Sequence, residues 1–356
     1  MSSTTPIPSQ QFPVYIIGAG GIVNTAHLPA YRLAGYDVQG ITDIVLDKAT
    51  ATAEKFNIPA VYKSMTEMVQ QAPGNAIFDV AVPGTSLLAV MEQLPRGAYV
   101  LLQKPMGENF REAKKIFQLA CDKQLVAAVN FQLRYAPYML AVKQLIQENQ
   151  LGELYDIEIN VNVYTPWHLW DFLFTTPRVE ILYHSIHYID LVRTLLGNPQ
   201  TLFAKTTKHP AMPQLASVRS NIVMDYGENV RANILTNHCH NYGTAKQQSY
   251  IKIEGSKGAV MIQFGTLINY PEGIADRVEY ILTDKNNTPA WQELKTAGSW
   301  FPHAFIGSMA QVMLAAEGTV QRPDNSVEDA IYTMACVEAA YCSGGKKAIN
   351  PDSFFI

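Results

Sequence analysis

The first third of the chain alternates apolar runs with stretches at helical spacing. The run FPVYIIG at 12–18 passes through a glycine-rich turn into a helical stretch at 23–35. Helical stretches also separate the apolar runs that follow, at 36–43, 76–82, 98–104 and 125–129. Strands that are apolar throughout are buried on both faces, and strands that alternate with helices form parallel sheets. This alternation predicts an α/β Rossmann fold with a doubly wound parallel sheet.

The pattern changes after Phe131. A helical stretch at 136–149 comes first, and the strands that follow are separated by turn signals. Their alternation of apolar and polar residues favours an antiparallel sheet with one covered face. The segment EGSKGA at 254–259 is typical of a hairpin turn. These strands are expected at 153–164, 216–226, 230–238, 249–264 and 276–283.

The length of the chain favours two domains. Its 356 residues exceed a single small domain. Helices near the C-terminus, at about 303–317 and 326–341, are expected to complete the second domain. We therefore predict a Rossmann domain over residues 1–130. Residues 131–356 are predicted to form an α+β domain with a large, mostly antiparallel sheet, which binds substrate and supports oligomerisation.

Composition and charge exclude several classes of function. The net charge of −4 offers no sign of the basic patches that bind nucleic acid or an anionic membrane. No apolar run approaches the roughly eighteen residues of a membrane span. The polar leader Met1–Gln11 lacks the basic and apolar regions of a signal peptide. The four cysteines are interpreted as reduced thiols, so we expect a cytoplasmic protein.

The glycine-rich turn is similar to the phosphate loop of dinucleotide-binding domains. Gly18 and Gly20 match the first two glycines, which allow a tight turn and a close approach of backbone to pyrophosphate, but Val23 replaces the third. Gly21 and Ile22 complete the turn at the start of a helix, whose N-terminus favours anions. The alternative is that these glycines serve the turn alone. The strand before and the helix after favour cofactor binding.

Asp43 ends the second predicted strand, about twenty residues beyond the turn. A carboxylate there accepts a hydrogen bond from the adenosine ribose 2′-OH and repels a 2′-phosphate. Ile44, Val45 and Leu46 follow it, so no arginine lies nearby in sequence. We therefore expect NAD as the cofactor, and NADP stays open because a neighbouring loop could supply a cation. The alternative role for Asp43 is to cap a helix.

A lysine follows the fourth of these apolar runs, in the segment LQKPMG at 102–107. An apolar strand end does not need an amine. The carboxyl edge of a parallel sheet is, however, where such sheets bind ligands. Lys104 could there hydrogen-bond a reacting oxygen and relay a proton, and Pro105 restricts its backbone to extended conformations. The alternative is an ordinary surface lysine.

The chain resembles the Gfo/Idh/MocA oxidoreductases in three segments, GAGGIVNTAHLPA at 18–30, QKP at 103–105 and SIHYID at 185–190. The resemblance implies hydride transfer between NAD(P) and a sugar, cyclitol or related polyol or ketone, in a homodimer or homotetramer. It implies that Lys104 is catalytic and that Pro83, Gln103 and Lys104 lie at the cofactor. The usual triplet of the family is Glu-Lys-Pro. Because Gln103 removes a negative charge, the pKa of Lys104 should be lower than beside a glutamate.

The resemblance also places a histidine in the active site. His187 and Asp190 stand at the family's histidine and last aspartate, while Tyr183 replaces the first aspartate and Ser185 a glycine. His187 is therefore the expected general acid or base, and Tyr183 or His184 could replace the lost carboxylate. With no carboxylate one turn earlier, we expect the pKa of His187 to lie near its reference value of about 6.5.

Weaker signals point to substrate contacts. The resemblance implies that Arg134, between the domains, faces the substrate, with Asp190 also at that site. A salt bridge is the alternative for Arg134. Trp167 and His168 lie in an aromatic segment that suits a sugar, but a packed loop core explains it equally well.

Several alternative functions stay open. His184, His187 and Asp190 are spaced by three, and the segment NHCH at 237–240 resembles a metal pair. Neither shows a further ligand, so no metal is expected. His187 could instead be a structural histidine in an inactive site. A dinucleotide-binding sensor of the same fold, or an NAD-dependent enzyme that processes glycosides, is the rival to a dehydrogenase.

Overall fold

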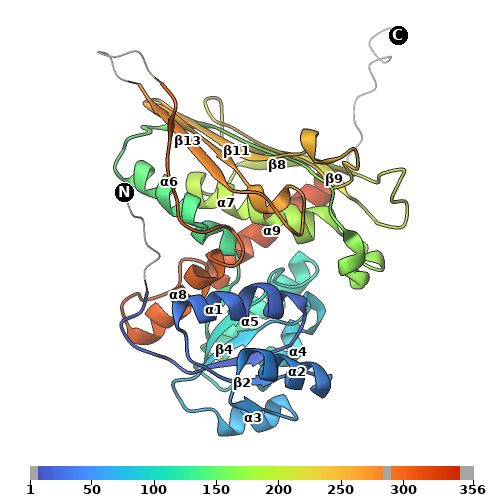
Figure 1. Ribbon diagram of the computed structural model, residues 1–356, viewed down its shortest axis with the longest axis vertical. Helices are drawn as coiled ribbons and strands as arrows, with labels where there is room; N and C mark the ends of the chain where they lie inside the picture. Colours follow the sequence, from blue (N-terminus) through green and yellow to red (C-terminus); the bar gives the residue numbers. More distant parts are fainter. Residues whose placement is uncertain (1–6, 284–289, 345–356) are drawn as a thin grey trace.

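The computed structural model describes residues 7–283 and 290–344. Figure 1 shows two layered bodies stacked along the long axis, with the blue and cyan N-terminal elements in one and a large sheet across the other. Residues 1–6 of the predicted leader lie outside the described residues. None of the helices in these ranges combines the length and apolar character that crossing a membrane requires. All four cysteines are free thiols.

A six-stranded parallel sheet forms the centre of the first domain, in the order β3-β2-β1-β4-β5-β6. Its strands are buried because their sequences are apolar on both faces. The direction of the strand order reverses between β1 and β4, which creates the switch point where such sheets bind ligands. This confirms the predicted Rossmann fold. The strands are β1 (Val14–Ile17), β2 (Val38–Thr42), β3 (Ala60–Val61), β4 (Ile77–Val80), β5 (Tyr99–Leu102) and β6 (Val126–Val129).

Helices connect these strands. The first begins as a π-helical turn, η1, and α1 ends at Gly35, whose φ of 69° is the left-handed conformation that glycine favours at a helix end. The side chain of Asn109 caps α5 by accepting a hydrogen bond from the Glu112 N–H at 3.0 Å. The helices are η1 (Val23–His27), α1 (Leu28–Ala34), α2 (Leu46–Phe56), α3 (Met65–Gln71), η2 (Gly84–Ser86), α4 (Leu87–Gln93) and α5 (Phe110–Asp122).

An eight-stranded sheet forms the second domain, in the order β14-β13-β12-β11-β7-β10-β9-β8. Neighbouring strands run antiparallel except β7 and β10, which pair in parallel. The predicted hairpin turn is confirmed by the pairing of Gly255 with Gly258. The strands are β7 (Leu154–Asn162), β8 (Thr201–Thr207), β9 (Arg219–Asp225), β10 (Arg231–Asn237), β11 (Gln248–Gly255), β12 (Gly258–Gln263), β13 (Arg277–Leu282) and β14 (Gln292–Glu293).

Helices cover one face of the large sheet. Figure 1 shows α6, α7 and α9 between that sheet and the first domain. Side chains along β9 alternate between buried and exposed, so the opposite face is open. This arrangement confirms the predicted α+β domain with its mostly antiparallel sheet. The bounds are η3 (Gln132–Tyr135), α6 (Pro137–Gln147), η6 (Ile181–Ser185, a π-helical turn), α7 (Ile186–Leu196) and α9 (Val327–Gly344).

Helix α8 (Ala304–Glu317) departs from the expected domain division. We expected it to complete the second domain, but its Phe305 and Met309 pack in one core cluster with Ile16 and Ile41 of the first sheet. Buried residues lie all around α8, which is typical of a helix enclosed on several sides. The first sheet ends with β6, and α8, from the far end of the chain, packs against β5 and β6 of that sheet.

Candidate active site

The phosphate loop follows β1 directly. Gly18 has a φ of 108°, and a Cβ there would lie 2.5 Å from the Ala81 oxygen, so only glycine fits. A Cβ at Gly20 or Gly21 would meet no described atom within 4 Å. The surface above these two glycines is therefore open to a ligand. A pyrophosphate fits this loop, because backbone can approach it closely at the start of the π-helical turn η1.

Asp43 follows β2 directly and hydrogen-bonds the phosphate loop through its carboxylate. Its Oδ2 accepts a hydrogen bond from the Ala19 N–H at 2.7 Å, and its Oδ1 accepts one from the Val45 N–H at 2.8 Å. The residue that caps α2 is Val45, so Asp43 does not have the capping role left open by the sequence. Its carboxylate lies beside the phosphate loop, as the expected contact with an adenosine ribose requires.

The loops after β4 and β5 lie against each other. A Cβ on Gly84, next to Pro83, would lie 2.9 Å from Glu108 Oε1 and 3.3 Å from the Pro105 oxygen. The close approach brings the Pro83 loop beside the segment that carries Lys104. The predicted cofactor residues of the first domain therefore gather along one edge of its sheet.

Lys104 reaches from the first domain to the second. Its Nζ donates a hydrogen bond to the Tyr183 carbonyl oxygen at 2.7 Å and lies 5.9 Å from the centre of the Tyr183 ring. Because the surrounding protein withdraws the ammonium from water, burial lowers the pKa of Lys104 to about 8. A lysine with such a pKa can exchange a proton near neutral pH.

His187 lies in the first turn of α7 and is 6% exposed. The Phe131 and Trp300 rings stand at right angles to its ring, and its Nδ1 has no hydrogen-bond partner among the described residues. Burial, and then the charge of Lys104, lower the pKa of His187 well below its ordinary value. Our expectation of a pKa near 6.5 is therefore wrong. It accounted for the missing carboxylate but not for burial among aromatic rings.

His184 occupies the preceding π-helical turn. Its ring contacts the Trp167 ring at 4.9 Å and the His238 ring at 4.4 Å between centroids. Burial, followed by the charges of His238, Lys104 and His187, lowers the pKa of His184 well below its ordinary value. Both histidines of this segment are therefore neutral at neutral pH, and both lie near the lysine.

The Tyr183 hydroxyl points away from these histidines toward a carboxylate of the first domain. It donates a hydrogen bond to Glu108 Oε1 at 2.6 Å. Burial raises the pKa of Glu108, and burial together with that carboxylate raises the pKa of Tyr183. Sequence reasoning missed Glu108, although it is the first acidic residue after the QKP segment. The pair joins the lysine loop to the turn that carries His184.

A buried carboxylate also lies behind the histidines. Glu180 is fully buried, its Oε1 accepts a hydrogen bond from the Ser185 hydroxyl at 2.7 Å, and His238 Nε2 lies 3.4 Å from the same oxygen. Burial alone would raise the pKa of Glu180, but its contacts with His238 and the hydroxyl donors hold it below the ordinary value. The sequence offered only one signal, a glutamate in an otherwise apolar stretch.

Arg134 and Asp190 form an ion pair in the protein interior. Asp190 Oδ2 accepts from the Arg134 Nε–H at 2.6 Å, and Arg134 also bonds to Asp329 and to the Asp324 carbonyl oxygen. The side chains of Arg134 and Asp190 are 3% and 1% exposed, and the Thr333 hydroxyl donates a hydrogen bond to Asp190. The structure thus shows the salt bridge that the sequence left open. A contact of either residue with the substrate stays a prediction.

The two candidate residues of the aromatic segment, Trp167 and His168, differ in exposure. Trp167 is fully buried in a cluster with Leu173 and Val179, which is the packed loop core left open by the sequence. His168, next to it, is exposed. Among the described residues, no hydrogen bond or ring contact joins either of them to Lys104 or His187. A role in sugar binding stays a prediction. Within those residues no group of three His, Cys, Asp or Glu side chains is arranged to hold a metal ion.

Comparison with known families covers both domains. Residues 12–131 match the Gfo/Idh/MocA family model described as an NAD-binding Rossmann fold. Residues 143–348 match the model of the family's C-terminal alpha/beta domain. The chain belongs to the Gfo/Idh/MocA oxidoreductases. The resemblance in the three sequence segments is confirmed, and so is the expected class of cofactor, a nicotinamide dinucleotide.

Individual relatives are distant. YceM of Salmonella typhimurium, named as an oxidoreductase, is 33% identical over 36% of this chain and 41% of its own length. The inositol 2-dehydrogenase/D-chiro-inositol 3-dehydrogenase of Lacticaseibacillus casei is 27% identical over 53% of this chain and 54% of its own length. The chain spans about half the length of the curated relatives it matches.

Solved structures resemble the whole chain in fold. An oxidoreductase from Agrobacterium radiobacter, solved with NAD+, L-tartaric acid and magnesium, has a TM-score of 0.76 at 20% identity, covering 94% of this chain and 96% of its own. An aldose-aldose oxidoreductase from Caulobacter crescentus, solved with glycerol, has a TM-score of 0.76 at 15% identity, covering 94% of this chain and 98% of its own. At these identities the likeness shows the fold alone.

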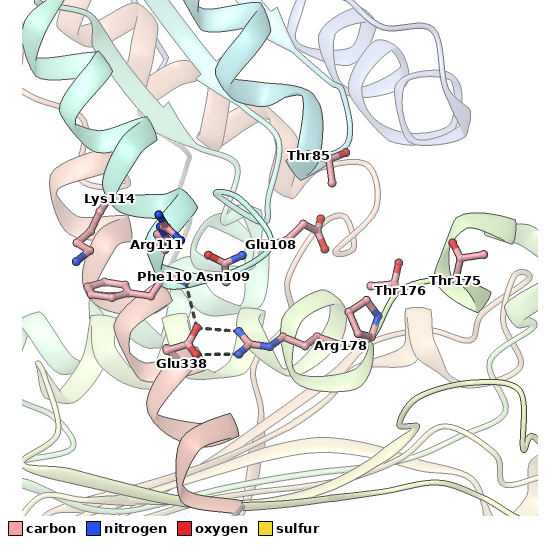
Figure 2. Close-up of a pocket in the computed structure, with 11 residues that line it drawn as sticks. Thr85, Glu108, Asn109, Phe110, Arg111, Lys114, Thr175, Thr176, Arg178 and Glu338 are labelled. Atoms are coloured by element: carbon pink, nitrogen blue, oxygen red, sulfur yellow. Dashed lines mark hydrogen bonds and ion pairs between the residues drawn. The ribbon is translucent and has the colours of Figure 1, made fainter.

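A cleft of about 830 Å³ lies between the domains of this Gfo/Idh/MocA protein. Its lining comes from Thr85, residues 108–111 and Lys114 of the first domain, and from residues 175–178 and Glu338 of the second (Figure 2). Arg178 donates two hydrogen bonds to Glu338, at 2.7 and 2.8 Å, and the Phe110 N–H donates to the same carboxylate at 3.1 Å. This clasp closes the cleft on the side of α9.

Proposed function

We propose that this protein is an NAD-dependent dehydrogenase or reductase. It would move a hydride between the nicotinamide and a CH–OH carbon of a sugar, cyclitol or related polyol. The observation that carries the proposal is Lys104 at the carboxyl edge of the cofactor sheet, whose amine donates a hydrogen bond to the Tyr183 carbonyl oxygen beside the turns that carry His184 and His187. Family membership supports the reaction class, and relatives are named as an inositol dehydrogenase and a 1,5-anhydro-D-fructose reductase.

The phosphate loop, Asp43 and the Pro83 loop would hold NAD, which when bound supplies the hydride acceptor. In alcohol oxidation the substrate hydroxyl must lose a proton as its carbon loses hydride. Lys104 can hydrogen-bond that oxygen and, as the neutral amine, accept the proton. His187 Nδ1, buried and without a partner in the described residues, is a second acceptor or donor within the site. In reduction the protonated lysine returns the proton.

The cofactor preference follows from Asp43. Its carboxylate would accept a bond from a free ribose 2′-OH, and a 2′-phosphate would be repelled. We therefore infer NAD in preference to NADP. Fluorescence titration with NADH and NADPH tests this, and equal or tighter binding of NADPH contradicts it.

Assembly and location complete the proposal. Phe203, Val223 and Leu235 are 56%, 49% and 43% exposed on neighbouring strands of the open sheet face. We infer that this face forms a homo-oligomer interface in a cytoplasmic enzyme. Sedimentation velocity of the protein and of Val223→Glu tests the interface, and a monomeric wild type contradicts it.

The reaction itself is tested by absorbance at the reduced-nicotinamide band. The protein is incubated with NAD together with one compound at a time, drawn from a panel of sugars, cyclitols and linear polyols. We expect at least one to reduce NAD, at a rate proportional to enzyme concentration. Tight NADH binding without turnover of any compound would instead indicate a dinucleotide sensor. Release of a sugar from a glycoside without net NADH would indicate a hydrolase that uses NAD transiently.

A further inference from the structure

A buried polar cluster lies directly beneath the catalytic lysine. His27, Asp79 and Asn130 are fully buried, and Gln103 is 9% exposed. They come from four elements, because His27 ends η1 after the phosphate loop, Asp79 lies in β4, and Gln103 and Asn130 follow β5 and β6. Buried polar groups are costly unless they are paired, so a cluster joining four elements is expected to serve a specific arrangement.

The hydrogen bonds define a direction through the cluster. Gln103 Oε1 accepts from the backbone N–H of Lys104 at 2.9 Å, so the Gln103 amide turns its NH₂ group toward His27 Nε2, 3.5 Å away. The Asn130 NH₂ group also faces this nitrogen, at 3.3 Å. An imidazole nitrogen facing two amide donors must accept. We therefore assign His27 Nε2 as the acceptor of these two amides.

The proton of His27 must then lie on Nδ1. Nδ1 is 2.7 Å from Asp79 Oδ2, which is a short bond to a carboxylate. The Tyr31 hydroxyl donates to the same oxygen at 2.7 Å. The chain of donors and acceptors thus runs from Asp79 through His27 and the Gln103 amide to the main chain of Lys104. Each member fixes the orientation of the next.

We infer that His27, oriented by Asp79, is a positioning residue that holds Lys104 in place through the Gln103 amide. Because η1 begins at the phosphate loop, the same imidazole ties the cofactor loop to the strand that carries the lysine. His27 touches neither substrate nor the reacting atoms. The inference rests on the proposed function for its catalytic meaning, but the placement of Lys104 can be measured without a substrate.

The pKa of Lys104 reports that placement. The groups that face Lys104 are the Tyr183 carbonyl and ring, and the imidazoles of His184 and His187, all from the second domain. Burial among them lowers its pKa to about 8 from an ordinary 10.5. If its main chain is released, the amine gains access to water and its pKa should rise toward the ordinary value.

The test is competitive acetylation of Lys104 in the full protein across a range of pH, read by mass spectrometry. The variants are His27→Leu, which keeps bulk without polarity, and His27→Gln, whose amide can both donate to Asp79 and accept from Gln103. We expect wild type and His27→Gln to share one labelling curve. His27→Leu should shift it to higher pH, lowering the labelling rate at neutral pH by about tenfold for each unit of pKa.

Two further variants keep the test decisive. Ser343→Ala removes a buried hydrogen bond to the Ala204 N–H in the second domain and serves as a control for lost stability. Gln103→Met breaks the same chain one step later and replaces His27→Leu if that variant does not fold. An unchanged labelling curve in His27→Leu or Gln103→Met overturns the inference. Equal curves for His27→Leu and His27→Gln overturn it too.

Activity gives the second readout once a substrate is known. His27→Leu should lower kcat by about tenfold or more while the KM for NAD changes little, because one misplaced acid–base group affects the chemical step. His27→Gln should recover most of that loss. If no substrate is turned over by the wild type, the proposed function fails, but the labelling curves still decide whether His27 positions Lys104.

Discussion

Lys104 links the two domains through the amine that the proposed reaction uses. The first prediction concerns its removal. Lys104→Ala should lower turnover by roughly a hundredfold or more, the usual scale of one acid–base group, while NADH affinity stays within a few-fold. Steady-state kinetics and NADH fluorescence measure the two effects. Lys123→Ala, which removes a lysine that bonds the Met91 and Glu92 carbonyl oxygens, is the matched control. Turnover of Lys104→Ala within a few-fold of wild type would exclude the catalytic role.

The second prediction is a pH dependence. Burial lowers the pKa of Lys104 to about 8, so the amine is protonated below that value. Because a base must be neutral, kcat/KM for oxidation should rise with pH and level off above about 8. Gln103→Glu places a negative charge beside the ammonium and should move this rise of kcat/KM to higher pH. Gln93→Glu, exposed on α4, adds the same charge far away and should not. If kcat/KM rises at the same pH in wild type and in Gln103→Glu, the account is contradicted.

Single residues were predictable where a local motif marks them. Gly18 and Asp43 lie at the spacing of a dinucleotide-binding turn, and the resemblance to the family singled out Lys104 and His187 as candidates. The carboxylates near the site did not show in the sequence. Glu108, Glu180 and Asp79 meet their own partners, Tyr183, His238 and His27, only across the fold. Burial was the other missing quantity. It explains why the pKa of His187 lies well below the expected value.

At the scale of elements, the phosphate loop gives the third prediction. Gly18→Ala would force an alanine into a φ of 108° and place its Cβ 2.5 Å from the Ala81 oxygen. We expect NADH binding to weaken by about tenfold or more and the melting temperature to fall, because the loop must move to accept the methyl group. Gly74→Ala, where a Cβ meets no described atom within 4 Å, is the control. Wild-type NADH affinity in Gly18→Ala would contradict the assigned loop.

Elements with a clear period were predictable, and weakly patterned ones were not. The first-domain strands other than the two-residue β3, and the β11–β12 hairpin, were found because continuous apolar runs and glycine turns mark them. β8 (Thr201–Thr207) was missed because only Ala204 is buried on it, so no alternation shows in its sequence. An edge strand of a sheet with one open face needs few apolar side chains.

At the scale of the whole molecule, the clasp between Arg178 and Glu338 gives the fourth prediction. The pKa of Glu338 is lowered from an ordinary 4.5 to about 2, and the hydrogen bonds from Arg178 are the largest cause. A carboxylate with a depressed pKa stabilises the fold above pH 4.5 and loses that effect as pH falls toward 2. Glu338→Gln should therefore lower the free energy of unfolding near pH 7 by about 1 kcal/mol or less, because both partners are partly exposed.

Urea unfolding at pH 7 and pH 4 measures this effect. The deficit of Glu338→Gln relative to wild type should be smaller at pH 4. Glu272→Gln, on an exposed loop, should show no such deficit. A deficit that grows as the pH falls would contradict the clasp.

The division into domains was only partly predictable. The change from buried runs to alternating strands marked the boundary near residue 130. That α8 returns to the first sheet could not be predicted, because a helix that is apolar on all sides does not indicate which neighbour it packs against. That return packs α8 against β5 and β6 of the first sheet and against η3 at the start of the second domain.

The most direct test of the central claim follows a single hydrogen. A compound that the protein oxidises is prepared with deuterium on the carbinol carbon, and the nicotinamide product is analysed by mass spectrometry. The account predicts deuterium in the reduced cofactor, with transfer slowed about a hundredfold or more in Lys104→Ala. A reduced cofactor without deuterium, or transfer at the wild-type rate in Lys104→Ala, would contradict it.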